Sequence, residues 1–401
     1  MLIEFGKLSY LHLIFLFIPI SYKIGGLLNE YFEIKVSKNK TYLIFNEYFS
    51  MCISGITIHL MIQYFSKTTK EKENEQYHKE KKKELKALKD SGEQGMNQYQ
   101  IIELNNIHKK KIETRKKFFF ILLIAYIQLI GLILENFVMP TILPYSSILL
   151  CKNNAFLILS IFFTLFSIIF LRFLLHRHQY FALGIIFVST IIFISQIIIY
   201  KENITIKDYL KGFLRLCIID FFYCLHDVLG KKYLNMYIDG VYLYMSKFSL
   251  ISGITLLIYD IIAYFCNVNE KYQGIIIAIK TYPFWWWLII FIFTSIFDLG
   301  TWIIIYYFSP HHFIILKTLL DITDLIHTLI KNEVNKDSYV LEQKITFFIL
   351  YPFIIFGLLV FNEILILNFW TLQYNTKQYI SKRELLEREI TNSLCSDDFP
   401  L

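Results

Sequence analysis

Three charged residues stand in a stretch of sequence that is otherwise apolar enough to lie in a membrane. The stretch is HHFIILKTLLDITDLIH, residues 311–327, and it contains Lys317, Asp321 and Asp324. Their spacing places all three side chains on one face of a helix, with Thr328 one turn further on. A lysine in this setting can attract an anion, whereas a carboxylate can accept hydrogen bonds from hydroxyl groups or carry a proton.

A charge at the centre of a bilayer costs about 2.5–3.5 kcal/mol on insertion scales. The presence of this charged face therefore requires an explanation. One explanation is that Lys317 and Asp321 neutralise each other and only adjust packing. A second is that the segment lies at the membrane interface without crossing it. A third, which we expect, is that the face lines a central, water-accessible substrate cavity. Lys317 would then attract an anionic ligand and be kept charged by Asp321 one turn away.

Other polar residues stand inside apolar segments and extend the set of candidates. Asp298 lies midway along 283–308, and Gln128 and Glu135 lie seven residues apart on one face of 117–139. The residues we expect to bind substrate are Lys317, Asp321, Asp324, Asp298, Asp220, Gln128 and Glu135. His226 and Asp227, near one end of 209–230, are candidates either for gating or for a charge cluster at the membrane interface.

Several further polar residues are expected to have no role in the site. Asp260 and Glu363 lie close to the ends of their segments, where such residues anchor a helix at the interface. His176 and His178 belong to a short basic turn without a neighbouring carboxylate in the sequence, so we expect both to be solvated.

The elements that position these residues are apolar blocks of about 20 residues, the length that spans a bilayer. The 401 residues are 55% hydrophobic and 18% aromatic, and their mean hydropathy is +0.47. The blocks are 8–28, 43–65, 117–139, 154–172, 180–200, 209–230, 241–266, 283–308, 311–330 and 345–369. This pattern predicts an all-α, polytopic membrane protein with ten transmembrane helices.

A basic loop at 66–117 sets the expected orientation. It holds fifteen Lys or Arg against nine Asp or Glu, and basic loops stay on the cytoplasmic side. Both termini are therefore expected in the cytoplasm, with 371–401 as a cytoplasmic tail. No aromatic residues alternate with the basic ones in this loop, so we expect no nucleic-acid partner; the expected partners are the bilayer, a small-molecule substrate and, in one alternative, a second copy of the chain.

The chain shows none of the sequence motifs that mark common catalytic or metal centres. HExxH, GxSxG and P-loop motifs do not occur, and the six cysteines have no metal-site spacing. We therefore expect no cofactor, no bound metal and no enzymatic activity. A polytopic acyl- or glycosyltransferase and a membrane scaffold without transport remain as alternatives.

Four stretches resemble the drug/metabolite transporter superfamily. Residues 163–194, FTLFSIIFLRFLLHRHQYFALGIIFVSTIIFI, resemble the end of its first repeat, where a Gln and a Gly, here Gln179 and Gly184, open the fifth helix. DFFYCLHDVLGKKYL (220–234) and YYFSPHHFIILKTLLDITDLIHTLI (306–330) are similar to its nucleotide-sugar and sugar-phosphate transporter branch. FFILYPFIIFGLLVFNEILIL (347–367) resembles its tenth helix.

The resemblance implies two inverted five-helix repeats, 1–200 and 201–370, that rock against each other around a central site. It also implies secondary transport of a polar, anionic metabolite by alternating access, in a Golgi or endoplasmic reticulum membrane. The substrate is expected to be of the nucleotide-sugar or sugar-phosphate class. The signatures Gly-Ala-Leu-Asn-Lys and Phe-Tyr-Asn-Asn of the nucleotide-mannose transporters do not occur in this sequence.

Overall fold

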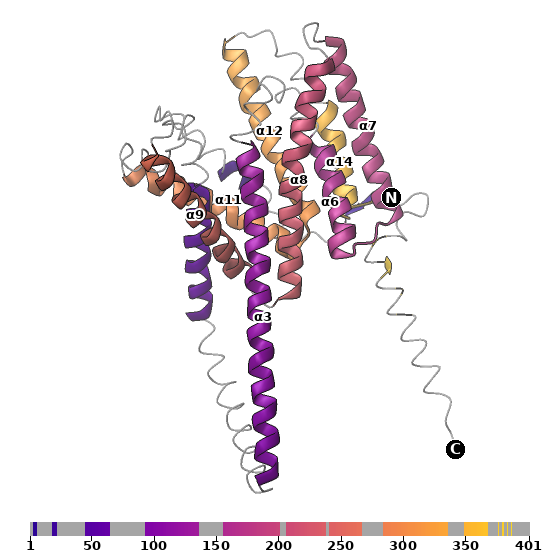
Figure 1. The fold of residues 1–401 in the computed structure, drawn as a ribbon. Helices are drawn as coiled ribbons and strands as arrows, with labels where there is room; N and C mark the ends of the chain where they lie inside the picture. The colour runs from indigo at the N-terminus through magenta and orange to yellow at the C-terminus, as the bar shows by residue number, and fades with distance from the viewer. Residues whose placement is uncertain are drawn as a thin grey trace, which may run out of the picture. The chain divides into compact units, whose positions relative to one another are not determined.

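A computed structural model describes most of the apolar part of the chain. The described residues are 3–5, 18–21, 45–64, 93–135, 155–200, 206–237, 240–266, 284–335 and 349–367, together with residues 376, 379, 380, 383 and 386. Within them the chain is almost entirely helical, which confirms the all-α prediction at this level (Figure 1).

The described elements are long helices and two very short strands. One helix occupies 45–64, and the others are α3 (Glu93–Ile133), α6 (Ala155–Leu171), α7 (Arg177–Tyr200), α8 (Ile206–Met236), α9 (Val241–Phe265), α11 (Phe284–Tyr307), α12 (Pro310–Asn335) and α14 (Tyr351–Phe361). Two three-residue strands, β1 (Ile3–Phe5) and β2 (Leu365–Leu367), pair antiparallel.

Most helices begin and end close to the predicted segments, but two predictions need correction. The helix α3 starts at Glu93, so the loop 66–117 is partly helical, as one of its expected states allows. The helix α8 continues to Met236, past the predicted end at 230. The last predicted segment, 345–369, is too long, because α14 ends at Phe361 and the apolar residues that follow form β2. The predicted segment 8–28 lies mostly outside the described residues.

The chain divides into two compact units. Unit 1 comprises Met1–Phe32, Gly131–Val228 and Ile303–Leu401, and unit 2 comprises Glu33–Ile130 and Leu229–Trp302. Each unit draws residues from both predicted halves, 1–200 and 201–370, so the compact units do not coincide with those halves. The inverted repeat therefore stays a prediction.

Close packing of α7 against α14 forms the centre of unit 1, with α6 and α12 beside them (Figure 1). Gly357 makes this contact possible. A Cβ atom built on it would lie 2.9 Å from Cγ1 of Ile186 and 3.3 Å from the carbonyl oxygen of Ala182. Both α7 residues are fully buried, so a small residue on α14 lets the two helix backbones approach.

Unit 2 is built around buried aromatic rings. The ring of Tyr244 on α9 lies 5.0 Å from that of Trp302 on α11 and 5.2 Å from that of Tyr233 on α8. A Cβ atom on Gly230 would lie 2.7 Å from the Trp302 indole and 2.5 Å from the Tyr244 hydroxyl. The cluster thus leaves room only for glycine at this point of α8.

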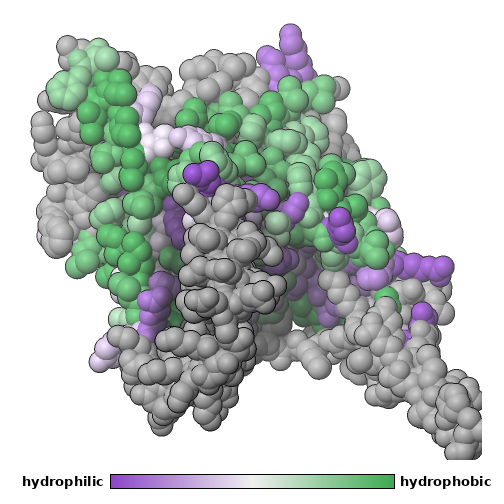
Figure 2. Space-filling model, turned by 60° about the horizontal axis from the view of Figure 1, so that its bottom comes forward, coloured by the Kyte–Doolittle hydropathy of each residue, from purple (hydrophilic) through white to green (hydrophobic). Residues whose placement is uncertain are grey.

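Apolar side chains also cover the outside of the helices. On α9 one stripe repeats every four residues, and its members are each about half exposed: Leu250, Ile254, Ile258 and Ile262. A similar stripe on α6 consists of Ile161, Leu165, Ile168 and Ile169. Figure 2 shows hydrophobic residues over most of the coloured surface on its side of the molecule. Patches of this kind mark contact with lipid or with another protein.

Two helices in the described part are long and apolar enough to cross a membrane, judged by length and composition. They are Glu113–Ile133 and Val241–Ile262. Shorter apolar helices run over Ile158–Leu171, Phe291–Tyr307 and Tyr351–Phe361. These observations fit association with a membrane, whereas a topology with ten spans stays a prediction.

Candidate functional site

The lysine of the charged segment forms an ion pair with a different helix. The Nζ atom of Lys317 on α12 lies 3.5 Å from Oδ1 of Asp220 on α8, and both residues belong to unit 1. The Asp220 side chain is buried at 2% exposure, while the Lys317 side chain is 30% exposed. Its neighbours Leu316 and Thr318 are completely buried, so the lysine is the accessible member of a buried stretch.

The two aspartates expected beside Lys317 can be placed only by their backbone. Asp321 and Asp324 both lie on α12, but their side chains are outside the described part of the structure. The expected pairing of Lys317 with Asp321 therefore stays a prediction. One partner of Lys317 in the structure is Asp220, a predicted site residue from another element.

Further polar contacts lie on α8 on either side of Asp220. The hydroxyl of Tyr223 donates a hydrogen bond to Oε2 of Glu135, which follows the end of α3. Arg215 donates from Nη2 to the backbone carbonyl of Glu135 at 3.2 Å. The end of α3 approaches α8 closely because Gly131 has no side chain: a Cβ there would lie 2.9 Å from the Cβ of Phe222.

Two predicted site residues, Asp220 and Glu135, thus make polar contacts with other residues of unit 1. Asp220 and Tyr223 are three residues apart on α8, so their side chains share a face of that helix. The structure therefore links Lys317, Asp220, Tyr223 and Glu135 through α8. We call these four residues the α8 polar cluster.

The predicted gating pair is also found in unit 1. Nδ1 of His226 lies 3.0 Å from Oδ1 of Asp227, the next residue along α8. Both residues are buried. A charge cluster exposed at a membrane interface would be accessible, so the described geometry favours a local, buried contact; a gating role stays a prediction.

Two other predicted residues, Asp298 and Gln128, belong to unit 2. Asp298 on α11 is buried and its Oδ2 lies 3.0 Å from the hydroxyl of Ser50. Gln128 on α3 is buried as well, and within the described part of the chain its Oε1 has no hydrogen-bond partner. A single cavity shared with Lys317 would need both units, and it stays a prediction.

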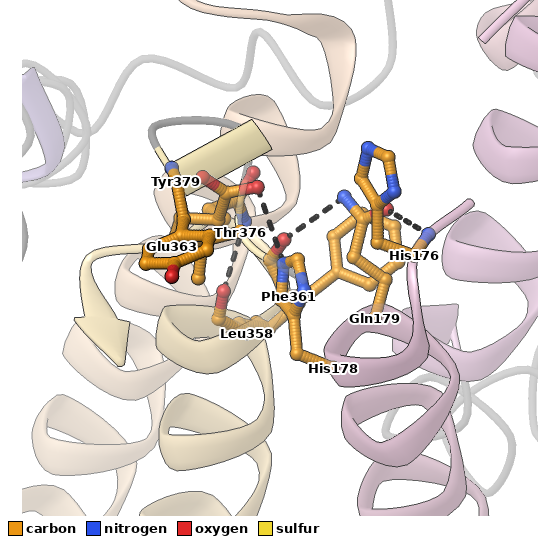
Figure 3. A network of polar contacts seen from close by, with 9 residues as sticks. His176, His178, Gln179, Leu358, Phe361, Glu363, Thr376 and Tyr379 are labelled. Carbon is orange, nitrogen blue, oxygen red and sulfur yellow. Dashed lines mark hydrogen bonds and ion pairs between the residues drawn. The ribbon is translucent and has the colours of Figure 1, made fainter. Parts of the chain in front are cut away.

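A second polar network in unit 1 joins α7 to the end of α14 (Figure 3). Nε2 of His178 lies 3.2 Å from Oε1 of Glu363, and the His178 side chain is only 3% exposed. The expectation that His178 is solvated is therefore wrong. The carboxylate next to it comes from a residue far along the chain, which no local sequence pattern reveals.

Gln179 holds the same junction together from the α7 side. Its Oε1 accepts a hydrogen bond from the backbone N–H of His176 at 3.0 Å, and its Nε2 donates to the carbonyl oxygen of Phe361 at 3.3 Å (Figure 3). One side chain therefore satisfies a free backbone donor at the start of α7 and a free acceptor at the end of α14. Immediately after α14, Glu363 adopts a left-handed φ of 58°, which turns the chain toward β2.

Within the described residues, no three or more histidine, cysteine, aspartate or glutamate side chains are grouped as a metal ion would require. Comparisons with known protein families and with curated proteins give no match to this sequence.

Proposed function

We propose that this protein is a secondary transporter that moves a polar, anionic metabolite across an endoplasmic reticulum or Golgi membrane by alternating access. The distribution of apolar and charged residues supports a membrane setting, because it is the reverse of the distribution in a water-soluble protein. Apolar stripes lie on the outside of α6 and α9, while charged residues such as Asp220 and Asp298 are buried inside. In water that arrangement is unfavourable, whereas in lipid it places each group in a suitable environment.

The observation that carries the proposal is the ion pair between Lys317 and Asp220. The pair joins α12 to α8, and its two members are unequally accessible, with the lysine open and the aspartate buried. An anionic group that approaches Lys317 can replace Asp220 as its partner. Charge-assisted contacts contribute about 1.5–3 kcal/mol. A contact of this strength between Lys317 and an anionic substrate can form and break reversibly.

Exchange of partners also suggests how binding and movement are connected. While Lys317 is paired with Asp220, α12 and α8 are tied together. When the substrate binds Lys317, this contact between the two helices is lost. The buried carboxylate of Asp220 must then be neutralised in another way. A substrate that binds one arrangement of the helices more tightly than the other shifts the population between them. The Glu135 carboxylate of the α8 polar cluster can accept hydrogen bonds from sugar hydroxyls.

The proposal is tested by uptake into liposomes that contain the purified protein. Labelled nucleotide sugars and sugar phosphates form the panel of substrates, and unlabelled compound inside the vesicles drives exchange. Lys317→Met keeps most of the side-chain volume and removes the charge. Loss of one charge-assisted contact should reduce uptake about 10- to 100-fold.

Controls separate loss of charge from loss of fold. Lys317→Arg keeps the positive charge and should retain partial activity. Lys116→Met makes the same chemical change at an exposed position of α3 and should transport normally. Immunoblotting measures the amount of each variant in the liposomes, and gel filtration of the solubilised protein checks that it is folded. Normal uptake by Lys317→Met, or no uptake of any panel member by the unaltered protein, would refute the proposal.

A further inference from the structure

A buried carboxylate in unit 2 stands apart from the α8 polar cluster. Asp298 is the only residue with a formal charge in α11, and it is 4% exposed. Its Oδ2 lies 3.0 Å from the hydroxyl oxygen of Ser50, which is on the helix at 45–64. The carboxyl group is thus enclosed between two helices of the same unit.

Nothing positively charged is paired with this carboxyl group in the described part of the chain. The contact of Asp298 is with a neutral hydroxyl, and Glu47, on the same helix as Ser50, repels a negative charge there. A buried, unpaired carboxylate is strongly unfavourable in an apolar setting. The group therefore needs to be neutralised, and a proton is the simplest way.

The hydrogen bonds of Ser50 also indicate that Asp298 can be protonated. Its hydroxyl oxygen lies 2.8 Å from the backbone carbonyl oxygen of Glu47 and 3.0 Å from Oδ2 of Asp298. One hydroxyl carries one hydrogen and can donate only once at full strength. If it donates to the carbonyl, the contact with Asp298 requires that the carboxyl group be protonated and donate to Ser50. If Asp298 is ionised, Ser50 can turn and donate to it instead.

Two further buried polar atoms on these helices have no hydrogen-bond partner among the residues that the structure describes. Oδ1 of Asn46 is buried one turn before Ser50, and the hydroxyl of Ser295 is buried one turn before Asp298. Residues one turn apart share a helix face, so both atoms lie on the faces that carry the Ser50–Asp298 contact. Both oxygens can accept a hydrogen bond, so each can hold a water molecule that brings or removes the proton.

We propose that Asp298 reversibly binds one proton and couples proton movement to transport; the coupling rests on the function proposed above. The proton moves from water on one side of the membrane to a carboxylate oxygen of Asp298, and Ser50 then donates to Glu47. When the proton leaves to the other side, Ser50 donates to Asp298. No other atom is gained or lost in this cycle.

Several titratable groups of the described residues lie near Asp298. On the helix at 45–64 they are Glu47 and Tyr48, both of which interact electrostatically with Asp298. Tyr48 also packs against α9, where a Cβ on Gly253 would lie 3.6 Å from its own Cβ. The charged residues of α9 itself are Lys247 and Asp260.

The first test needs no substrate. Infrared difference spectra of the protein in liposomes are recorded between about pH 6 and pH 9, where exposed carboxylates stay ionised. We expect a carbonyl band of a protonated carboxylic acid that is lost in Asp298→Asn and shifted in Ser50→Ala. Glu113→Gln, which changes an exposed carboxylate on α3, should leave the band unchanged. A spectrum of Asp298→Asn identical to that of the unaltered protein overturns the inference.

The second test separates this inference from the proposed function. Uptake of the labelled panel is measured with an inward proton gradient, with an inward sodium gradient and with neither. We expect the proton gradient to increase uptake several-fold in the unaltered protein and in Glu113→Gln, but not in Asp298→Asn. Uptake that responds only to sodium, or to no gradient, overturns proton coupling and leaves transport standing. A lack of any uptake counts against the transporter, while the infrared result still decides whether Asp298 binds a proton.

Discussion

The contact between α7 and α14 predicts how much stability is lost when a glycine in it is replaced. Two glycines of these helices give the magnitude of this loss. In Gly357→Ala, the new methyl group would lie 2.9 Å from Cγ1 of Ile186 and 3.3 Å from the carbonyl oxygen of Ala182. Either Ile186 or the helix backbone must move, and overpacking of this kind costs about 1–3 kcal/mol. Alanine also favours the helix over glycine by about 0.5–1 kcal/mol. The net expectation is a loss of about 0–2.5 kcal/mol in the free energy of unfolding.

A matched control is available on the facing helix. Gly184 lies inside α7, and a Cβ built on it meets nothing within 4 Å. Gly184→Ala should therefore gain the helix-propensity term of about 0.5–1 kcal/mol without any clash. Because the propensity term is common to both variants, their difference in stability isolates the clash and should be about 1–3 kcal/mol.

The two variants are compared by reversible unfolding of the solubilised protein with sodium dodecyl sulfate, followed by circular dichroism. Ile186→Ala is then added to each, since it removes the atom that the new methyl group would meet. The combined Gly357→Ala/Ile186→Ala variant should lose less stability than the sum of its single changes. Equal stability of Gly357→Ala and Gly184→Ala would show that α14 does not approach α7 as described.

Three further outcomes follow from contacts inside single units. Gly230→Ala should lower the melting temperature of the solubilised protein, since its methyl group would lie 2.7 Å from the indole of Trp302, and a neutral effect would contradict this packing. Glu363→Ala should lower the free energy of unfolding because it removes the carboxylate that lies 3.2 Å from Nε2 of the buried His178. Unfolding by denaturant measures the loss, and no change would contradict the pair. Tyr223→Phe removes one hydrogen bond to the carboxylate that follows α3. It should cost about 1.5–3 kcal/mol in the same unfolding measurement, and an unchanged midpoint would count against that bond.

The positions of most helices follow from the sequence because apolar blocks of membrane length are a strong signal. The end of a helix is harder to predict where the apolar sequence continues beyond it. After Phe361 only Asn362 and Glu363 are polar, and the chain then continues with Ile364 and the apolar residues of β2. Hydrophobicity therefore indicates one long segment, whereas the turn at Glu363 depends on contacts with α7.

The candidate site shows the same division between local and distant information. The sequence singles out Lys317 because a lysine in an apolar helix is conspicuous, but periodicity reveals only neighbours on the same helix. Its partner Asp220 comes from α8, and only the fold brings them together. Likewise, His178 has no carboxylate nearby in the sequence, and Glu363 reaches it from a distant part of the chain. Pairs of this kind become predictable only from the three-dimensional structure.

The short pairing of β1 with β2 limits the topology of the proposed membrane protein. Ile3 is opposite Leu367 and Phe5 is opposite Leu365, so these two distant segments lie at the same place. Two strands with open edges cannot sit in lipid, because their outer backbone groups would lack hydrogen-bond partners. In the proposed membrane topology, β1 and β2 therefore lie on one side of the bilayer, and the chain returns to that side between residues 5 and 365. This topology requires an even number of crossings between these points, and it predicts that a tag before β1 and a tag after β2 are reached by the same impermeant reagent.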